Sequence, residues 1–176
     1  MKKPDHPFIF KYIFVILLTG YGLIGKSQNL VPNPSFETFT TCPLTYQGIC
    51  QGLAPPWTCG STGSVDLFNS CGGPSSDMGV PNNLLGSQPA ITGTGYAGLL
   101  CRWPNTNYRE YLMVPLTPLT AGSWYYLSFY VSLAETACGI EHIGAYFTAN
   151  NPYMNNFYVM DVEPQIETNN GYISDK

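Results

Sequence analysis

The chain has 176 residues, of which 44% are hydrophobic and only 10% charged, whereas about a quarter of the residues of an ordinary globular domain are charged. This composition excludes a disordered polyelectrolyte, and Gly 18 with Pro 15 favours many short strands joined by turns over a helical fold. The formal net charge is -4, so the chain carries no basic surplus for a nucleic-acid backbone, and we expect no nucleic-acid partner.

Residues 1–27 have the pattern of a secretory signal peptide. Lysines flank and interrupt an apolar run over residues 8–24, and small residues near Ser27 suit cleavage. A membrane anchor is the alternative, but the uninterrupted apolar length falls short of the roughly 20 residues that a bilayer needs. We therefore expect an exported chain with no membrane span after cleavage. Its mature part, residues 28–176, is expected to form one module.

All six cysteines lie in the mature part, where an oxidising compartment permits disulfides. Zinc is the alternative, but the cysteine spacings match no short metal-binding motif, and His142 is the single mature histidine. Disulfides are therefore the expected state. The pairs that we prefer among the many pairings are Cys42–Cys71, Cys50–Cys59 and Cys101–Cys138.

The mature part has two textures. Residues 28–94 are rich in Pro, Gly, Ser, Thr, Asn and Cys, which predicts long loops stapled by disulfides. From Gly95 onward, β-branched and aromatic segments bounded by Gly, Pro or Asn are typical of strands. These segments span 96–103, 108–114, 124–133, 143–149 and 157–162. Strands in series without a helix pattern predict an all-β antiparallel sandwich.

The segment 124–133 is the most informative of these strands, because apolar and polar-aromatic residues alternate along it. We expect its apolar set to enter the core between two sheets. Tyr126 and Tyr130 would then lie on an outer or concave face that is open to a ligand. The alternative is that tyrosine simply suits strands.

A series of motifs runs through the mature part. They are NLVPNPSFE (29–37), PPWTCGSTGSVDLFNSC (55–71), GVPNNLLGSQPA (79–90), GYAGLL (95–100), NYREYL (107–112), PLTAGSWYYLSFYVSLAE (118–135) and IGAYF (143–147). In this order they resemble the amino-terminal module of exported envelope proteins of gliding, type IX-secreting bacteria. That module is often joined to an OmpA-like peptidoglycan-binding domain or a sorting domain. More loosely, the chain is similar to jelly-roll carbohydrate-binding modules with a galactose-binding-like fold.

The resemblance implies a jelly-roll sandwich at the outer membrane, at the cell surface or outside the cell. The family continues with further strands beyond the point at which this chain ends, so we expect the sandwich to lack its last strands and to keep an open edge. In the similar carbohydrate-binding modules the glutamate of SFE, here Glu37, helps to bind a structural Ca²⁺. Cys42 and Cys71 fall where the family favours cysteine, whereas the other four cysteines look like additions.

Catalytic arrangements are weakly supported. A serine hydrolase needs a base beside its nucleophile, but His142 is the only mature histidine and no Gly-x-Ser-x-Gly elbow occurs. A glycosidase needs two facing carboxylates, which the spacing of the acidic residues does not exclude. The acidic residues near Glu163 fit a solvated face, however, and Glu110 beside Arg109 fits a local ion pair. We therefore expect a module that is not an enzyme and needs no catalytic cofactor.

Binding is the function that the residues favour. Tryptophan and tyrosine rings stack on sugars, and polar side chains bind ligand hydroxyls, although alternation puts only one of Arg109 and Glu110 on a given face. The candidate ligand-binding residues are Trp57, Trp103, Tyr108, Arg109, Glu110, Tyr126, Tyr130, Asn82, Asn83 and Gln88. The expected partner is a polysaccharide or cell-wall glycan. The alternative is a structural or adhesion module that binds a protein at the open sheet edge.

Overall fold

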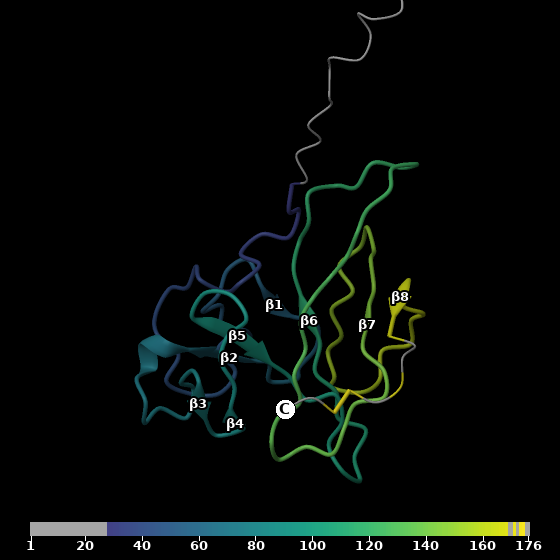
Figure 1. Cartoon of the computed structure of the whole chain (residues 1–176). Helices are drawn as coiled ribbons and strands as arrows, with labels where there is room; N and C mark the ends of the chain where they lie inside the picture. Colours follow the sequence, from purple (N-terminus) through teal and green to yellow (C-terminus); the bar gives the residue numbers. More distant parts are fainter. Residues whose placement is uncertain (1–27, 169–170, 172, 175–176) are drawn as a thin grey trace, which may run out of the picture.

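The structure is a computed structural model, which describes residues 28–168, 171, 173 and 174. Within these residues the protein is all-β, with short strands, one 3-10 turn and no α-helix (Figure 1). The all-β prediction is confirmed at this level. None of the described residues belongs to a helix that could cross a bilayer. The expected signal peptide, residues 1–27, lies outside the described residues.

The strands that the structure describes form four two-stranded sheets, each antiparallel. The pairs are β1 (Thr58–Cys59) with β6 (Leu112–Met113), β2 (Asp66–Asn69) with β5 (Gly95–Gly98), β3 (Asn82–Asn83) with β4 (Gly86–Ser87), and β7 (Gly144–Ala145) with β8 (Ile166–Glu167). The 3-10 turn η1 (Ser70–Gly72) follows β2 directly. The sequence segments that pair are far apart in three of the four sheets, so the fold depends on long-range contacts.

The β2–β5 pair is the longest of the four described sheets. Phe68 of β2 lies opposite Tyr96 of β5, and their ring centroids are 5.3 Å apart. The strand ends at Asn69, whose side chain accepts a hydrogen bond from the Cys71 amide at 3.0 Å and so caps η1. Leu67 and Phe68 are fully buried, which shows that packing covers both faces of this strand.

The hydrophobic core lies in the part of the chain that the sequence predicts to be loops. Its main cluster consists of Ile49, Ala54, Cys59, Val65 and Leu67, all buried. Among the described residues after Gly95, Leu133 is the single buried hydrophobic residue. The expectation that the apolar set of residues 124–133 enters the core is therefore wrong except at Leu133. Isolated apolar pairs in the first half are gathered by turns and disulfides, which a strand pattern does not reveal.

Two of the expected disulfides are present, Cys42–Cys71 and Cys50–Cys59. The third is not formed, because Cys101 and Cys138 are free thiols. Cys101 is half-buried, and burial raises the pKa of its thiol, with the Arg109 guanidinium opposing that shift. Cys138 is exposed on a different loop. The two cysteines therefore lie in different environments, one half-buried and one exposed, and they do not form the expected disulfide.

The later predicted strands are only partly formed. β5, β6 and β7 overlap the segments 96–103, 108–114 and 143–149, but each strand is shorter than expected. The segments 124–133 and 157–162 contain no regular strand. The second of these nevertheless docks on the chain, because the Arg109 amide donates a hydrogen bond to the Phe157 carbonyl at 2.7 Å.

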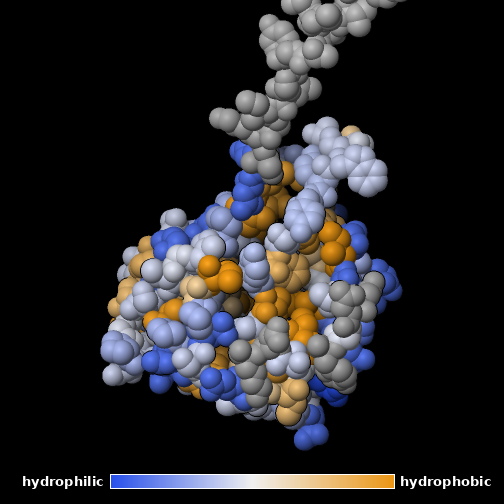
Figure 2. All heavy atoms as spheres, viewed as in Figure 1, coloured by the Kyte–Doolittle hydropathy of each residue, from blue (hydrophilic) through white to orange (hydrophobic). Residues whose placement is uncertain are grey.

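The segment 124–133 belongs to an extended excursion, residues 114–133, which we call the arm. The arm turns at Gly122, whose φ is +78°, and there the Ser123 amide donates to the Thr120 carbonyl at 3.2 Å. Figure 1 shows the arm in green, reaching beyond β1 and β6, and Figure 2 shows its tip standing clear of the surface. The expected strand is wrong because no neighbouring segment of the described chain supplies backbone hydrogen-bonding partners, although the alternation of side chains is present.

Candidate ligand-binding cleft

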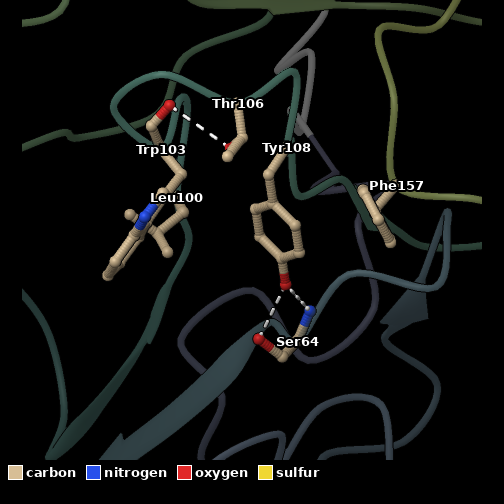
Figure 3. Close-up of a pocket in the computed structure, with 6 residues that line it drawn as sticks. All are labelled: Ser64, Leu100, Trp103, Thr106, Tyr108 and Phe157. Carbon is tan, nitrogen blue, oxygen red and sulfur yellow. Dashed lines mark hydrogen bonds between the residues drawn. The ribbon is translucent and has the colours of Figure 1, made fainter.

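A cleft of about 410 Å³ opens between the loop after β5 and the segment around Phe157 (Figure 3). Four aromatic or apolar side chains form its walls, and hydroxyl groups add polar atoms. The lining residues are Ser64, Leu100, Trp103, Thr106, Tyr108 and Phe157. None of these side chains carries a charge. The cleft includes Trp103 and Tyr108, two of the residues expected to bind ligand.

A tight turn presents Trp103. The Thr106 amide donates to the Trp103 carbonyl at 3.3 Å, and Asn105 has a φ of +60°. Proline in the second position and a positive φ in the third are typical of a type II turn, so the sequence WPNT favours this geometry. The Trp103 side chain is 54% exposed, and no described residue accepts a hydrogen bond from its indole N–H. The ring face and its donor are thus open to a ligand.

Tyr108 and Phe157 lie on the other side of the cleft, as Figure 3 shows. Their ring centroids are 5.2 Å apart at an interplanar angle of 35°. The backbone bond from Arg109 to Phe157 fixes this pair, and the Thr62 amide donates to the Asn156 carbonyl at 3.1 Å nearby. Segments from three distant parts of the chain therefore hold the aromatic wall.

Glu110 lies buried behind the cleft, with 6% of its surface exposed. Its Oε1 atom accepts hydrogen bonds from the Ser64 amide at 3.0 Å, the Ser64 hydroxyl at 2.7 Å and the Tyr108 hydroxyl at 2.9 Å. Its Oε2 atom accepts from the Leu100 amide at 2.7 Å. Gly63 leaves room for this carboxylate, because a Cβ there would lie 2.9 Å from the Glu110 Cγ. Glu110 thus acts on the cleft by positioning its walls.

Arg109 does not pair with Glu110. Its Nη1 donates to the Tyr108 carbonyl at 2.9 Å, and the ion pairs of the described residues involve only His142. The expected ion pair is therefore wrong, because both carboxylate oxygens of Glu110 accept hydrogen bonds from neutral donors. Arg109 is half-buried and is not among the residues that line the cleft.

Besides Cys101, two ionisable groups around Glu110 have shifted pKa values. Burial raises the pKa of the Tyr108 phenol, with the Ser64 hydrogen bond opposing and the Glu110 carboxylate reinforcing the shift. Asp66 on β2 accepts a hydrogen bond from the Gln47 amide at 2.6 Å. Burial raises the pKa of Asp66 to about 6, against the lowering effect of that bond and with a smaller contribution from Glu110. Because its pKa is raised, the Tyr108 phenol stays neutral at neutral pH and its hydroxyl keeps the proton that it donates.

Trp57 is part of the core and not of the cleft. Its ring centroid lies 5.0 Å from that of Phe36, and its Nε1 donates to the Asn33 carbonyl at 2.7 Å. It packs against the buried cluster around Ile49. The Trp57 side chain anchors the amino-terminal loop. Its ring packs against Phe36 and its N–H group donates to Asn33, so neither is open to a ligand.

Asn82, Asn83 and Gln88 lie on or beside the β3–β4 hairpin. The Asn83 side chain donates to the Tyr96 hydroxyl at 2.7 Å and accepts from the Leu85 amide at 2.9 Å. Asn82 is exposed, and the Gln88 side chain donates to the Pro89 carbonyl at 3.2 Å. Asn83 thus stabilises the hairpin turn. None of the three lines the cleft.

Tyr126 and Tyr130 lie on the arm, where they are 90% and 79% exposed. They form no described hydrogen bond and are not part of the cleft. The residues expected to bind one ligand are thus distributed over the cleft, the core, a hairpin and the arm.

Glu37 joins the amino-terminal loop to the start of β5. Its Oε1 accepts from the Thr94 and Gly95 amides at 2.7 and 3.1 Å, and its Oε2 accepts from the Thr94 hydroxyl at 2.9 Å. Ca²⁺ requires about six to eight oxygen ligands. Within the described residues no three His, Cys, Asp or Glu side chains gather in a way that could hold a metal ion. The described surroundings of Glu37 therefore do not fit a calcium site.

Sequence reasoning missed Ser64, Leu100, Thr106 and Phe157. Thr106 belongs to the turn motif WPNT, which is a signal that could have identified it. Ser64 and Phe157 carry no such signal, because they reach the cleft through contacts with Tyr108 that span 44 residues or more of chain.

The histidine considered for catalysis lies elsewhere. His142 is 3.2 Å from the Glu167 carboxylate and 4.0 Å from that of Glu141, and more than half of its side chain is exposed. It does not line the cleft. The arrangement at the cleft therefore consists of aromatic rings, hydroxyls and a buried carboxylate that accepts hydrogen bonds from neutral donors.

No family model matches the chain, and neither a curated protein nor a solved structure matches it.

Proposed function

We propose that this protein is a non-catalytic exported envelope module that binds a neutral carbohydrate in the cleft. The observation that carries the proposal is the exposed indole of Trp103 beside a cleft of about 410 Å³. Ligand pockets commonly enclose about 300 to 1,000 Å³ and combine apolar walls with a few polar groups. A pyranose ring fits within this volume, and its C–H face stacks on an indole while its hydroxyls form hydrogen bonds with those of the protein.

The absence of charge among the lining residues favours a neutral sugar. Buried beneath them, Glu110 keeps its negative charge behind the Ser64 and Tyr108 hydroxyls. A sugar acid or phosphate would bring a second negative charge toward that carboxylate, at an electrostatic cost. We therefore assign the cleft to hexoses or N-acetylhexosamines within a longer glycan.

Export and the finer fold are parts of the same proposal. The signal-peptide pattern of residues 1–27 and the two disulfides fit an oxidising compartment. The exclusively antiparallel pairing of the described strands fits a jelly-roll sandwich. The motif order along residues 29–147 supports a place among envelope modules of the OmpA-associated kind.

The test is a calorimetric titration of the full chain, expressed for export, with galactose, glucose and N-acetylglucosamine and with their oligomers. We expect binding of at least one of these sugars, and Trp103→Ala should weaken it roughly tenfold or more because the stacking surface is lost. Trp124→Ala is the matched control, since Trp124 is fully exposed on the arm. It should bind like the unchanged chain. No heat with any sugar, or equal losses in the two variants, would contradict the proposal.

A second candidate function is a structural or adhesion module that binds a protein. A different observation favours it, namely the arm, whose segment 124–133 has no strand partner among the residues that the structure describes. Exposed unpaired strands are templates for pairing with another chain. A glycan titration without response, together with self-association, would favour this candidate over the first.

A further inference from the structure

The second half of the arm has an unused backbone. Residues 124–133 neither donate nor accept a backbone hydrogen bond within the described part of the chain. The arm is fixed at its base, where Leu133 is 5% exposed and the Glu135 amide donates to the Leu85 carbonyl at 3.1 Å. An extended segment that is anchored at its base and keeps its backbone groups unpaired is ready to add to a sheet.

The side chains of this segment are exposed together with its backbone. Trp124 is 100% exposed, Tyr126 90% and Tyr130 79%. Tyr125 and Phe129 on the alternate side are about half exposed. Natural edge strands are protected by charges, prolines, bulges or short length. This segment has ten residues and no Pro, Gly or charged residue, so it lacks those protections.

The charge distribution favours a second copy of the same chain as the occupant. No charged residue occurs between Glu110 and Glu135, whereas the chain after residue 27 keeps 10 of its 11 acidic and 3 of its 7 basic residues. A cationic partner would be attracted to the acidic residues outside the arm and not to the arm itself. An anionic partner would be repelled by the same acidic residues. A second arm is neutral, and because the arm projects (Figures 1 and 2), the two acidic bodies remain apart.

We propose that two copies of the chain pair through residues 124–133 as antiparallel strands across a two-fold axis at Ser128. Opposite residues in an antiparallel pair share a face. This register therefore puts Tyr126 opposite the partner's Tyr130, and Leu127 opposite the partner's Phe129. Aromatic and aromatic–aliphatic cross-strand pairs stabilise such sheets. A two-fold arrangement forms each pair twice and closes the assembly at a dimer.

The dimer is independent of the carbohydrate proposal, because the arm residues do not line the cleft. Trp103→Ala should leave the dimerisation constant unchanged. The two proposals therefore fail separately: one through loss of the glycan response, the other through the oligomeric state.

The experiment is sedimentation of the full chain, expressed for export, over a wide concentration range. We expect a monomer–dimer equilibrium. The variant Tyr126→Lys/Tyr130→Lys places like charges opposite each other twice, and should weaken the dimer roughly tenfold or more. The matched variant Tyr126→Lys/Tyr130→Glu places opposite charges there, and should keep the dimer. Both positions are highly exposed, so folding should not change, which circular dichroism checks.

The register is tested by crosslinking in a background without the free thiols of Cys101 and Cys138. Ser128→Cys should form an intermolecular disulfide under mild oxidation, because residue 128 meets its own copy at the axis. Ser132→Cys should not. A chain that stays monomeric at all concentrations, or a dimer that both charge variants leave unchanged, would overturn the proposal. So would crosslinking at 132 in place of 128.

Discussion

At the scale of single residues, Glu110 links several segments around the cleft. One carboxylate accepts from Ser64, Tyr108 and the Leu100 amide, which belong to different segments. A buried carboxylate is stable in such a place because each oxygen has charge-assisted hydrogen bonds. Glu110 was expected to bind ligand directly, but its position makes it a support for residues that line the cleft.

Glu110→Gln should destabilise the fold by about 2 to 4 kcal/mol. The amide group keeps one acceptor oxygen, and its NH₂ group then faces donors that lose their partner. The free energy of unfolding in urea measures the effect. Glu163→Gln is the control, because Glu163 is exposed and has no described partner, and it should change stability by less than about 0.5 kcal/mol. Equal stability of the two variants would show that the Glu110 bonds contribute little.

At the scale of elements, the sequence predicts strands by local alternation and does not reveal their partners. The alternation of residues 124–133 is genuine, yet a ladder needs a neighbour at hydrogen-bonding distance, and the described chain provides none. Conversely, β2 was predicted to be part of a loop region, although Leu67 and Phe68 are fully buried. Its burial depends on β5 and on the Cys50–Cys59 crosslink, which are long-range features.

The cleft was partly predictable for the same reason. Trp103 and Tyr108 stand out as aromatic residues within or beside predicted strands, and both line the cleft. Phe157 is an equally plain aromatic residue, but its place opposite Tyr108 follows from a backbone bond to Arg109 nearly fifty residues earlier. Trp57 shows the opposite case, since a tryptophan expected to bind ligand instead supports the core.

The turn that presents Trp103 gives a prediction at this scale. Asn105 has a φ of +60°, a conformation that asparagine and glycine tolerate and β-branched residues avoid. Asn105→Val should therefore cost about 1 to 2 kcal/mol of local conformational energy, reorient Trp103 and weaken glycan binding at least tenfold. Asn105→Gly should bind as before. Calorimetric titration with the sugar that binds the unchanged chain gives the measurement, and near-ultraviolet circular dichroism reports the Trp103 environment.

At the scale of the whole molecule, stability should depend on pH through Asp66. Its pKa is about 6 in the folded chain and near 3.8 in the unfolded chain. Between these values the folded state binds more protons, so the free energy of unfolding falls as pH rises from about 4 to 6 and then levels off for this group. Below the lower value the Asp66 penalty disappears.

Asp66→Asn should remove this penalty while keeping an oxygen that accepts the Gln47 amide. Relative to the unchanged chain, the variant should gain stability as pH rises from 4 to 6, by roughly 1 to 2 kcal/mol once solvent screening at this half-buried carboxyl is allowed for. Above pH 6 the difference should stay constant. Urea unfolding at several pH values measures it, and a difference that is independent of pH would show that Asp66 keeps its ordinary pKa in the fold.

The position of the disulfides has a consequence for the covalent chain. Both crosslinks lie within residues 42–71, and neither spans the arm, whose tip is exposed.

A protease that cleaves after aromatic residues would meet Trp124, Tyr126 and Tyr130 in the arm, whereas trypsin finds no lysine or arginine between Arg109 and Lys176. Cleavage would give two fragments without a covalent link, joined by hydrogen bonds such as those from the Met154 amide to the Gly60 carbonyl and from the Arg109 amide to the Phe157 carbonyl. Because Phe157 would belong to the second fragment and Trp103 to the first, the ligand cleft would be shared by two separable chains, and complementation of separately made halves would rebuild it.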